Sequence, residues 1–206
     1  MSLFDLLFPP MCPYCGKQTD DVCETCAHCR SLTEIAPHKR RLTDKTVCYS
    51  AYEYEGVVRR AIIDYKYKNH SQYAKSFAKT YQRVIEQAHL KSEYDVYTAV
   101  PTHHHAERGR FDQMKRIVVP VARFEGVEYK QLMTPSRKTT AQHTLNREMR
   151  KENAKGLYAA SEPQYIEGKR ILIFDDVITT GATLMECAEV LYNAGAAKVD
   201  CITLAW

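Results

Sequence analysis

Five of the chain's eight cysteines lie close together near the start of the sequence. Cys12 and Cys15 form a C-x2-C pair followed by Gly16, and Cys26 and Cys29 form a second pair after a gap of ten residues. This spacing lets four thiolates surround one ion, which is the ligand set of a tetrahedral zinc site. Since four thiolates leave no open position for water, we expect the zinc to be structural.

The fifth cysteine leaves the identity of the fourth zinc ligand undecided. Cys23 also forms a C-x2-C pair with Cys26, so it is the substitute fourth ligand, although we prefer Cys26 with Cys29. His28 could also ligate the metal, but we expect it to point to solvent. The alternative to a metal site, reduced thiols on a flexible arm, leaves the paired spacing unexplained.

A second group of polar residues follows an apolar run near the end of the chain. The β-branched run at residues 170–174 is typical of a buried parallel strand. It is followed by Asp175 and Asp176, a threonine-rich turn, a helix that ends at Gly195, and another buried strand at residues 198–204. The order strand, turn, helix, strand is a βαβ unit and predicts an α/β fold.

The turn has the properties of an anion site. Its backbone N–H groups and hydroxyls lie at the N-terminus of the predicted helix, and the two carboxylates beside it suit sugar hydroxyls and a hydrated Mg²⁺. It is not a Walker P-loop, because the chain has no G-x4-G-K-[ST]. The pattern predicts a phosphorylated sugar as ligand; the alternative is a capped turn in which the acids begin a loop. The predicted ligand-binding residues are Asp175, Asp176, Val177, Ile178, Thr179, Thr180, Gly181, Ala182 and Thr183.

The composition is that of an ordinary globular protein. The 206 residues, 45% apolar and with a net charge of +4, suit one medium domain with a small appendage and exclude wholesale disorder. No apolar run approaches the roughly 20 residues needed to cross a bilayer. The apolar stretch at residues 3–8 contains Asp5 and lacks the basic flank of a signal peptide. We therefore expect a cytoplasmic protein without membrane insertion.

Basic residues are concentrated in two stretches. Between Arg59 and Lys91 there are eight basic residues, two acids and four tyrosines, and a second basic run covers residues 137–155. Cations can follow a phosphate backbone while tyrosines stack on bases, which is typical of single-stranded DNA binding. The apolar residues of the first stretch also fall near helical spacing, so its tyrosines could instead be core residues. Both interpretations stay open.

The sequence ILIFDDVITTGAT at residues 171–183 resembles the phosphoribosyl-pyrophosphate signature of type I phosphoribosyltransferases. Combined with C-x2-C-x10-C-x2-C, it resembles the ComF/GntX family, which includes the late-competence ComF protein of DNA-uptake operons. The chain departs from the family's R-G-F-N-Q at residues 108–113, which read RGRFDQ. Further points of resemblance are residues 54–60 and 66–68, Val100-Pro101, Phe111-Asp112-Gln113, and the spaced set Gln142, Leu145, Arg147, Asn153 and Gly156.

The resemblance implies a type I phosphoribosyltransferase-like, mainly parallel sheet flanked by helices, with a small N-terminal four-cysteine zinc module. We expect the zinc module and linker at residues 1–45 and the larger domain at residues 46–206. A strand at 95–100 would precede the pyrophosphate loop, and residues 136–155 would fold over the ligand. The implied contacts of the loop and lid are Pro101, Thr102, Arg108, Arg110, Arg137, Lys138 and Arg147.

The implied ligand is phosphoribosyl pyrophosphate with Mg²⁺. Asp175 and Asp176, the implied catalytic residues, would hold the ribose hydroxyls and Mg²⁺ while the threonine turn grips the 5′-phosphate. Any reaction would displace pyrophosphate from the anomeric carbon by a nitrogen nucleophile, through an oxocarbenium-like transition state. Whether turnover occurs stays open.

The family's role in DNA uptake implies the remaining partners. We expect a ComF-like competence protein that assists the uptake and processing of single-stranded DNA, together with a competence helicase and other DNA-processing proteins. One alternative is an active phosphoribosyltransferase of nucleotide metabolism. Another is an adaptor whose zinc module docks a partner while the ribose site senses a ligand.

Overall fold

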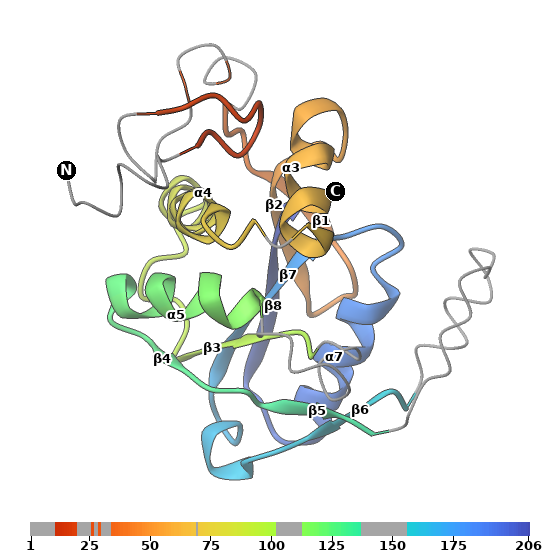
Figure 1. Cartoon of the computed structure of the whole chain (residues 1–206). Helices are drawn as coiled ribbons and strands as arrows, with labels where there is room; N and C mark the ends of the chain where they lie inside the picture. The colour runs from red at the N-terminus through yellow and green to blue at the C-terminus, as the bar shows by residue number, and fades with distance from the viewer. Residues whose placement is uncertain are drawn as a thin grey trace.

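The computed structural model of the chain describes residues 11–19, 26, 29, 34–68, 70–101, 113–136 and 156–206. A six-stranded sheet runs through the middle of the molecule, and helices pack on both of its faces (Figure 1). The strands of this sheet are β1 (His38–Arg41), β2 (Val47–Tyr52), β3 (Val96–Ala99), β4 (Glu128–Tyr129), β7 (Arg170–Val177) and β8 (Lys198–Ala205).

The sheet is mainly parallel, as the sequence predicts. Its strand order is β1-β2-β8-β7-β3-β4, and among these strands only β1 is antiparallel to its neighbour. β7 is central because its apolar run is covered on both faces: the residues from Ile171 to Phe174 are fully buried. β7 leads through a turn and α7 (Ala182–Asn193) into β8, so the predicted βαβ unit is confirmed.

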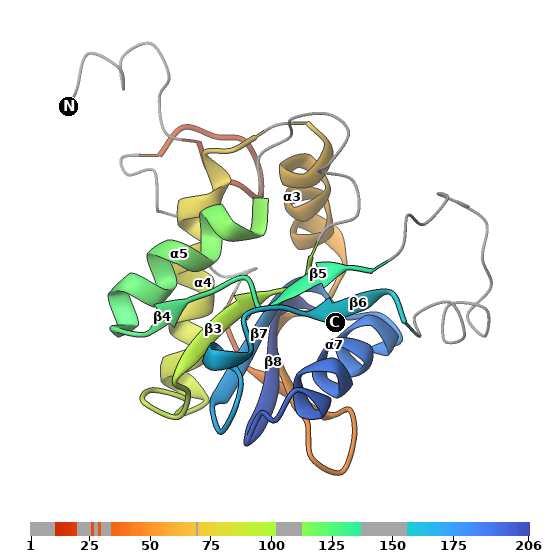
Figure 2. The ribbon, with the colours of Figure 1, turned by 90° about the horizontal axis from the view of Figure 1, so that it is seen from below.

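The helices form a layer on each side of the sheet. α4 (Tyr73–Gln87) and α5 (Gln113–Glu125) cover one face, and α7 covers the other (Figure 2). α3 (Gly56–Tyr67) packs on α4, where the rings of Tyr65 and Phe77 meet edge to face with centroids 5.4 Å apart. The α/β fold with flanking helices is therefore confirmed.

The three cysteines outside the N-terminal cluster are core residues. Cys48 on β2, Cys187 on α7 and Cys201 on β8 are all fully buried in the apolar cluster between the sheet and α7. Burial raises the pKa of the Cys48 thiol to about 12, which keeps it protonated and unreactive near neutral pH.

The basic stretch from Arg59 to Lys91 is mostly α3 and α4, and its tyrosines are largely core. Tyr65, Tyr73 and Tyr81 are buried, whereas Tyr67 is 70% exposed. Three of the four tyrosines therefore cannot stack on a nucleic acid base. For these three the interpretation as stacking residues is wrong, because they are buried. The sequence allowed both interpretations because an amphipathic helix and a basic-aromatic stretch place tyrosines at similar spacing.

The segment after the cysteine cluster joins the main sheet. Residues 38–41, expected in the linker, form β1 and pair with β2 in the register His38↔Ser50 to Arg41↔Val47. The division of the chain at residues 45 and 46 stays a prediction. In the part of the chain that the structure describes, no helix is both long and apolar enough to cross a bilayer.

Candidate functional site

The four predicted zinc ligands lie together. The sulfur atoms of Cys12, Cys15, Cys26 and Cys29 are all within 4.8 Å of one another, and the Sγ atoms of Cys15 and Cys26 are 3.4 Å apart. A tetrahedral zinc ion with Zn–S bonds of about 2.3 Å separates its sulfur ligands by about 3.8 Å. The donor set therefore fits a structural zinc ion. Cys23, the substitute ligand, lies outside the described residues.

Local hydrogen bonds shape the two cysteine turns. The N–H of Gly16 donates to the carbonyl of Cys12 at 2.9 Å, and Gly16 takes the left-handed conformation, with φ of 73°, that closes the first turn. The N–H of Cys29 donates to the carbonyl of Cys26 at 3.0 Å. Burial raises the pKa of the Cys29 thiol, so a bound metal would have to displace its proton.

Tyr14 attaches this cluster to the main core. Its side chain is buried, its ring meets that of Tyr52 edge to face with centroids 6.2 Å apart, and its hydroxyl donates to the hydroxyl of Tyr52 at 3.5 Å. The guanidinium of Arg60 on α3 donates to the carbonyl of Tyr14 at 2.8 Å. The first cysteine turn is thus fixed to both β2 and α3.

The two predicted acids are the last polar residues of β7, at the carboxyl end of a central strand. Asp175 Oδ1 accepts the N–H of Asp176 at 3.0 Å, and the Asp175 carbonyl accepts the hydroxyl of Tyr81 at 2.6 Å. Asp176 Oδ2 lies 2.5 Å from Nζ of Lys66 on α3. In open α/β sheets ligands bind at this edge, outside the carboxyl ends of the strands. Two carboxylates there are oxygen donors that fit Mg²⁺.

The environment raises the pKa of Asp175. Burial, together with the charge of Asp176, raises the pKa of Asp175 to about 7, although Lys66 acts against this shift. Near neutral pH the site therefore gains or loses a proton at Asp175 with small changes of pH. A cation bound at the Asp175 carboxylate would favour its ionised form.

This raised pKa predicts a pH dependence. The pKa of Asp175 in the folded chain exceeds that of an unfolded aspartate, about 3.9, so the folded chain holds one more proton between those values. Its contribution to stability is complete below pH 4 and is lost as the pH rises through about 7. Denaturant titrations from pH 4 to 8 should show this slope. Asp175→Asn should remove it, and an unchanged slope in that variant would contradict the assignment.

The turn after β7 continues the sheet before it begins α7. The N–H of Ile178 donates to the carbonyl of Ala205 at 2.9 Å, so this amide belongs to the sheet. Thr180 Oγ1 accepts the N–H of Ala182 at 3.3 Å, which satisfies one of the free amides at the helix start. Gly181 is the N-cap residue, with φ of 83°, a conformation that favours glycine. The remaining first-turn amides of α7 belong to a helix N-terminus, which is where anions bind in proteins.

Two cations that the sequence analysis did not assign contact this site. Lys66 pairs with Asp176, and Arg40 on β1 donates from Nη1 to the carbonyl of Thr179 at 3.1 Å and from Nη2 to that of Thr180 at 3.5 Å. Lys66 is one of the cations of the basic stretch from Arg59 to Lys91. Both contacts join residues far apart in the sequence, so no local spacing signalled them.

The predicted pyrophosphate loop and lid are described only at their ends. Pro101, two residues after the end of β3, is buried, and the N–H of Val100 donates to the carbonyl of Phe174, which places the start of the loop beside Asp175. β5 (Met133–Pro135) and β6 (Tyr158–Ala160) form an antiparallel pair, and the predicted lid is the segment of chain that connects them. The other predicted contacts lie outside the described residues: Thr102, Arg108, Arg110, Arg137, Lys138 and Arg147.

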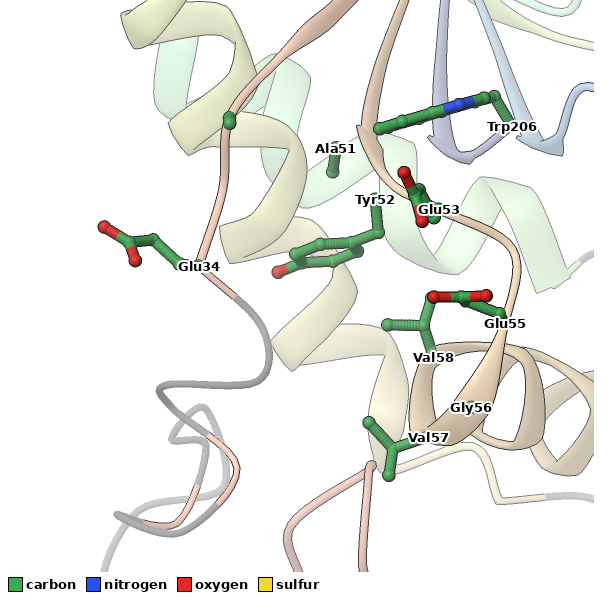
Figure 3. A pocket seen from close by; sticks show the side chains of 10 residues that line it. Glu34, Ala51, Tyr52, Glu53, Glu55, Gly56, Val57, Val58 and Trp206 are labelled. Atoms are coloured by element: carbon green, nitrogen blue, oxygen red, sulfur yellow. The ribbon is translucent and has the colours of Figure 1, made fainter.

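A cavity of about 440 Å³ lies at the same edge of the sheet, beyond the ends of β2 and β8 (Figure 3). Tyr52 and Trp206 line it from the two strands, Val58 from α3, and Glu53 and Glu55 from the connection between β2 and α3. None of its lining residues is among the predicted ligand-binding residues. The acid pair and the turn are therefore a separate place on this edge.

Comparison with known proteins agrees with the fold. The family model described as a phosphoribosyl transferase domain matches residues 114–205. The DNA utilization protein YhgH of Salmonella typhi is 28% identical over 196 residues, covering 92% of this chain and 81% of the relative. That of Escherichia coli K12 is 27% identical over 198 residues, with the same coverage.

A solved structure of the allosteric regulatory enzyme of purine biosynthesis is also similar, with 22% identity and a TM-score of 0.42, over 59% of this chain and 24% of that one. The matched segment contains β7, the acid pair, the turn, α7 and β8. The chain thus combines a fold of the phosphoribosyltransferase type with four N-terminal cysteines placed to bind a metal ion.

Proposed function

We propose that this chain is a ComF/GntX-type protein that binds phosphoribosyl pyrophosphate with Mg²⁺ and assists the handling of single-stranded DNA. The acid pair beside the helix-starting turn, within the matched segment, carries the ligand proposal. The carboxylates of Asp175 and Asp176 would hold the ribose hydroxyls and Mg²⁺. The N–H groups of the turn and of α7 would bind the 5′-phosphate.

The role in DNA handling is supported by the relatives named DNA utilization protein, which match 92% of this chain. A second support is a row of cations on α4. Lys75, Lys79 and Arg83 are four residues apart, so they lie on one side of the helix, and Lys75 and Arg83 are exposed. Such a row can follow a phosphate backbone without stacking residues.

Calorimetric titration tests the ligand. We expect saturable binding of phosphoribosyl pyrophosphate with Mg²⁺, and a large loss of affinity when Mg²⁺ is left out. Failure of the chain to bind the ligand would overturn the ligand proposal. Release of pyrophosphate in the presence of a nitrogen base would show turnover and favour the phosphoribosyltransferase alternative. Ligand-dependent binding of a protein partner without turnover would favour the adaptor.

The salt dependence of single-stranded DNA binding tests the second part. For single strands the slope of log K against log salt is about −0.7 for each neutralised phosphate. Changing Lys75, Lys79 and Arg83 together to glutamine should therefore reduce the slope by about 2. Lys39→Gln, Lys45→Gln and Lys198→Gln together are a matched control, because these exposed or half-exposed lysines lie on other elements. Equal slopes in both variants would contradict a DNA-binding role for α4.

A further inference from the structure

The threonine turn is fastened from outside the segment that matches the phosphoribosyl transferase domain. We propose that Arg40 is a positioning residue of the phosphate site, which holds two peptide groups of the turn in the orientation that binds an anion. The proposal rests on the proposed function, because the anion concerned is the phosphate of the sugar ligand. The contacts that carry it are those of the Arg40 guanidinium with the carbonyls of Thr179 and Thr180.

Because the peptide bond is planar, these contacts also fix the direction in which the neighbouring backbone N–H groups point. In a trans peptide the N–H of one residue points opposite to the carbonyl of the residue before it. When Arg40 holds the carbonyls of Thr179 and Thr180, the N–H groups of Thr180 and Gly181 must point away from β1. Two successive N–H groups directed to one side form a concave anion site together with the start of α7.

The strand that carries Arg40 is itself held in place. β1 pairs with β2, with Arg40 opposite Cys48, and the ring of His38 stacks on that of Trp206 with centroids 4.4 Å apart. Directly after the strand, Leu42 packs against the turn: a Cβ on Gly181 would lie 3.3 Å from Leu42 Cδ2. The strand that carries the Arg40 guanidinium is therefore held in a fixed position.

The chemistry requires arginine. A guanidinium presents several N–H donors in a rigid plane and can hold two neighbouring carbonyls at once, whereas an ammonium is a single point of charge. Arg40 also brings a positive charge to the back of a site for an anion, and its charged donors strengthen both hydrogen bonds. Arg41, the next residue on the strand, is exposed and points to the opposite face of β1, so it shares the charge without the contacts.

Two probes separate positioning of the turn from a general effect on the fold. Ribose 5-phosphate requires the turn, whereas inorganic pyrophosphate with Mg²⁺ requires the predicted pyrophosphate loop and the Mg²⁺ held by the acid pair, without the turn. We expect Arg40→Gln to weaken ribose 5-phosphate binding about tenfold or more and to change pyrophosphate–Mg²⁺ binding less than twofold. Arg40→Lys should lie between the two, and Arg41→Gln should match the unmodified chain for both probes. Calorimetry of the full-length chain and its variants measures all of these affinities.

A measurement without ligand tests the orientation directly. In ¹H–¹⁵N spectra, Arg40→Gln should shift the amide resonances of Thr180 and Gly181, while those of β3, on the far side of β7, stay in place. Arg41→Gln should leave both sets unchanged.

The outcomes are distinct. Equal affinity of the unmodified chain and Arg40→Gln for ribose 5-phosphate, with unmoved turn amides, would overturn the role of Arg40 and leave the ligand proposal standing. An equal loss for both probes would also overturn it, since that result marks a general effect on the fold. Failure of the unmodified chain to bind ribose 5-phosphate would overturn the proposed ligand site and with it the role of Arg40.

Discussion

Changing Asp175 and Asp176 together to alanine should abolish binding of phosphoribosyl pyrophosphate with Mg²⁺, with a loss of more than a hundredfold. The substitution removes every carboxylate oxygen that this edge of β7 offers to Mg²⁺ and to the ribose hydroxyls. The fold should survive, because the contact of Tyr81 is to the backbone carbonyl of Asp175, which alanine retains. Removal of the half-buried Asp175 carboxylate, whose pKa is raised, also relieves the repulsion between the two acids.

Calorimetry and thermal unfolding of the same samples measure both effects. Glu53→Ala with Glu55→Ala is a matched control, because it removes two carboxylates from the same edge of the sheet, at the separate cavity. We expect this control to bind the ligand within about twofold of the unmodified chain. Unchanged affinity in the Asp175 and Asp176 variant would sink the site assignment. Loss of affinity in the control would show that the lower affinity comes from the change in the protein's overall charge and not from these two carboxylates.

Chelation of zinc should unfold the cysteine segment at residues 11–33 and lower the stability of the larger domain without unfolding it. The segment depends on the metal because it is too short to bury a core of its own. Tyr14 would leave its place against Tyr52, and the loss of one buried aromatic side chain costs about 1.5–3 kcal/mol. For a chain of this length, that corresponds to a fall in Tm of about 3–12 °C.

Thermal scans with and without a chelator, limited proteolysis and metal analysis check this prediction. Cys26→Ser should lose the zinc, whereas Cys48→Ala should retain one ion for each chain because Cys48 is buried at the other face of the sheet. Cys23→Ser decides between the two predicted ligand sets: zinc retained in this variant supports Cys26 with Cys29. Unfolding of the whole chain on chelation would contradict the separate stability of the larger domain.

The features that the sequence predicted well depend on local spacing. The cysteine pairs bring four sulfur atoms together, and the run from Ile171 to Phe174 forms a buried strand, because each pattern is set within a few residues. Arg40 and Lys66 could not be predicted in this way. Arg40 meets Thr179 from 139 residues away, and that contact exists only once β1 has joined the sheet.

The burial of the tyrosines of α3 and α4 could not be predicted from the sequence, for a different reason. Basic residues alternating with tyrosines describe both a nucleic acid surface and an amphipathic helix, since the outer face of such a helix is charged and its inner face aromatic. The structure shows that Tyr81 belongs to the inner face of its helix, because its ring packs on Phe174 with centroids 5.1 Å apart. Burial of this kind depends on which surface the helix meets, and the helix sequence alone does not contain that information.

The two outermost strands of the sheet, β1 and β4, have a consequence for self-association. An edge strand with free backbone groups is a template on which a second chain can add a strand. β1 forms one edge and reads His38-Lys39-Arg40-Arg41, while β4 at the other edge has only two residues. Two copies of β1 would bring six permanent positive charges together, and β4 is too short to template a partner. Edge-to-edge growth of the sheet is thus opposed by charge on one side and by length on the other.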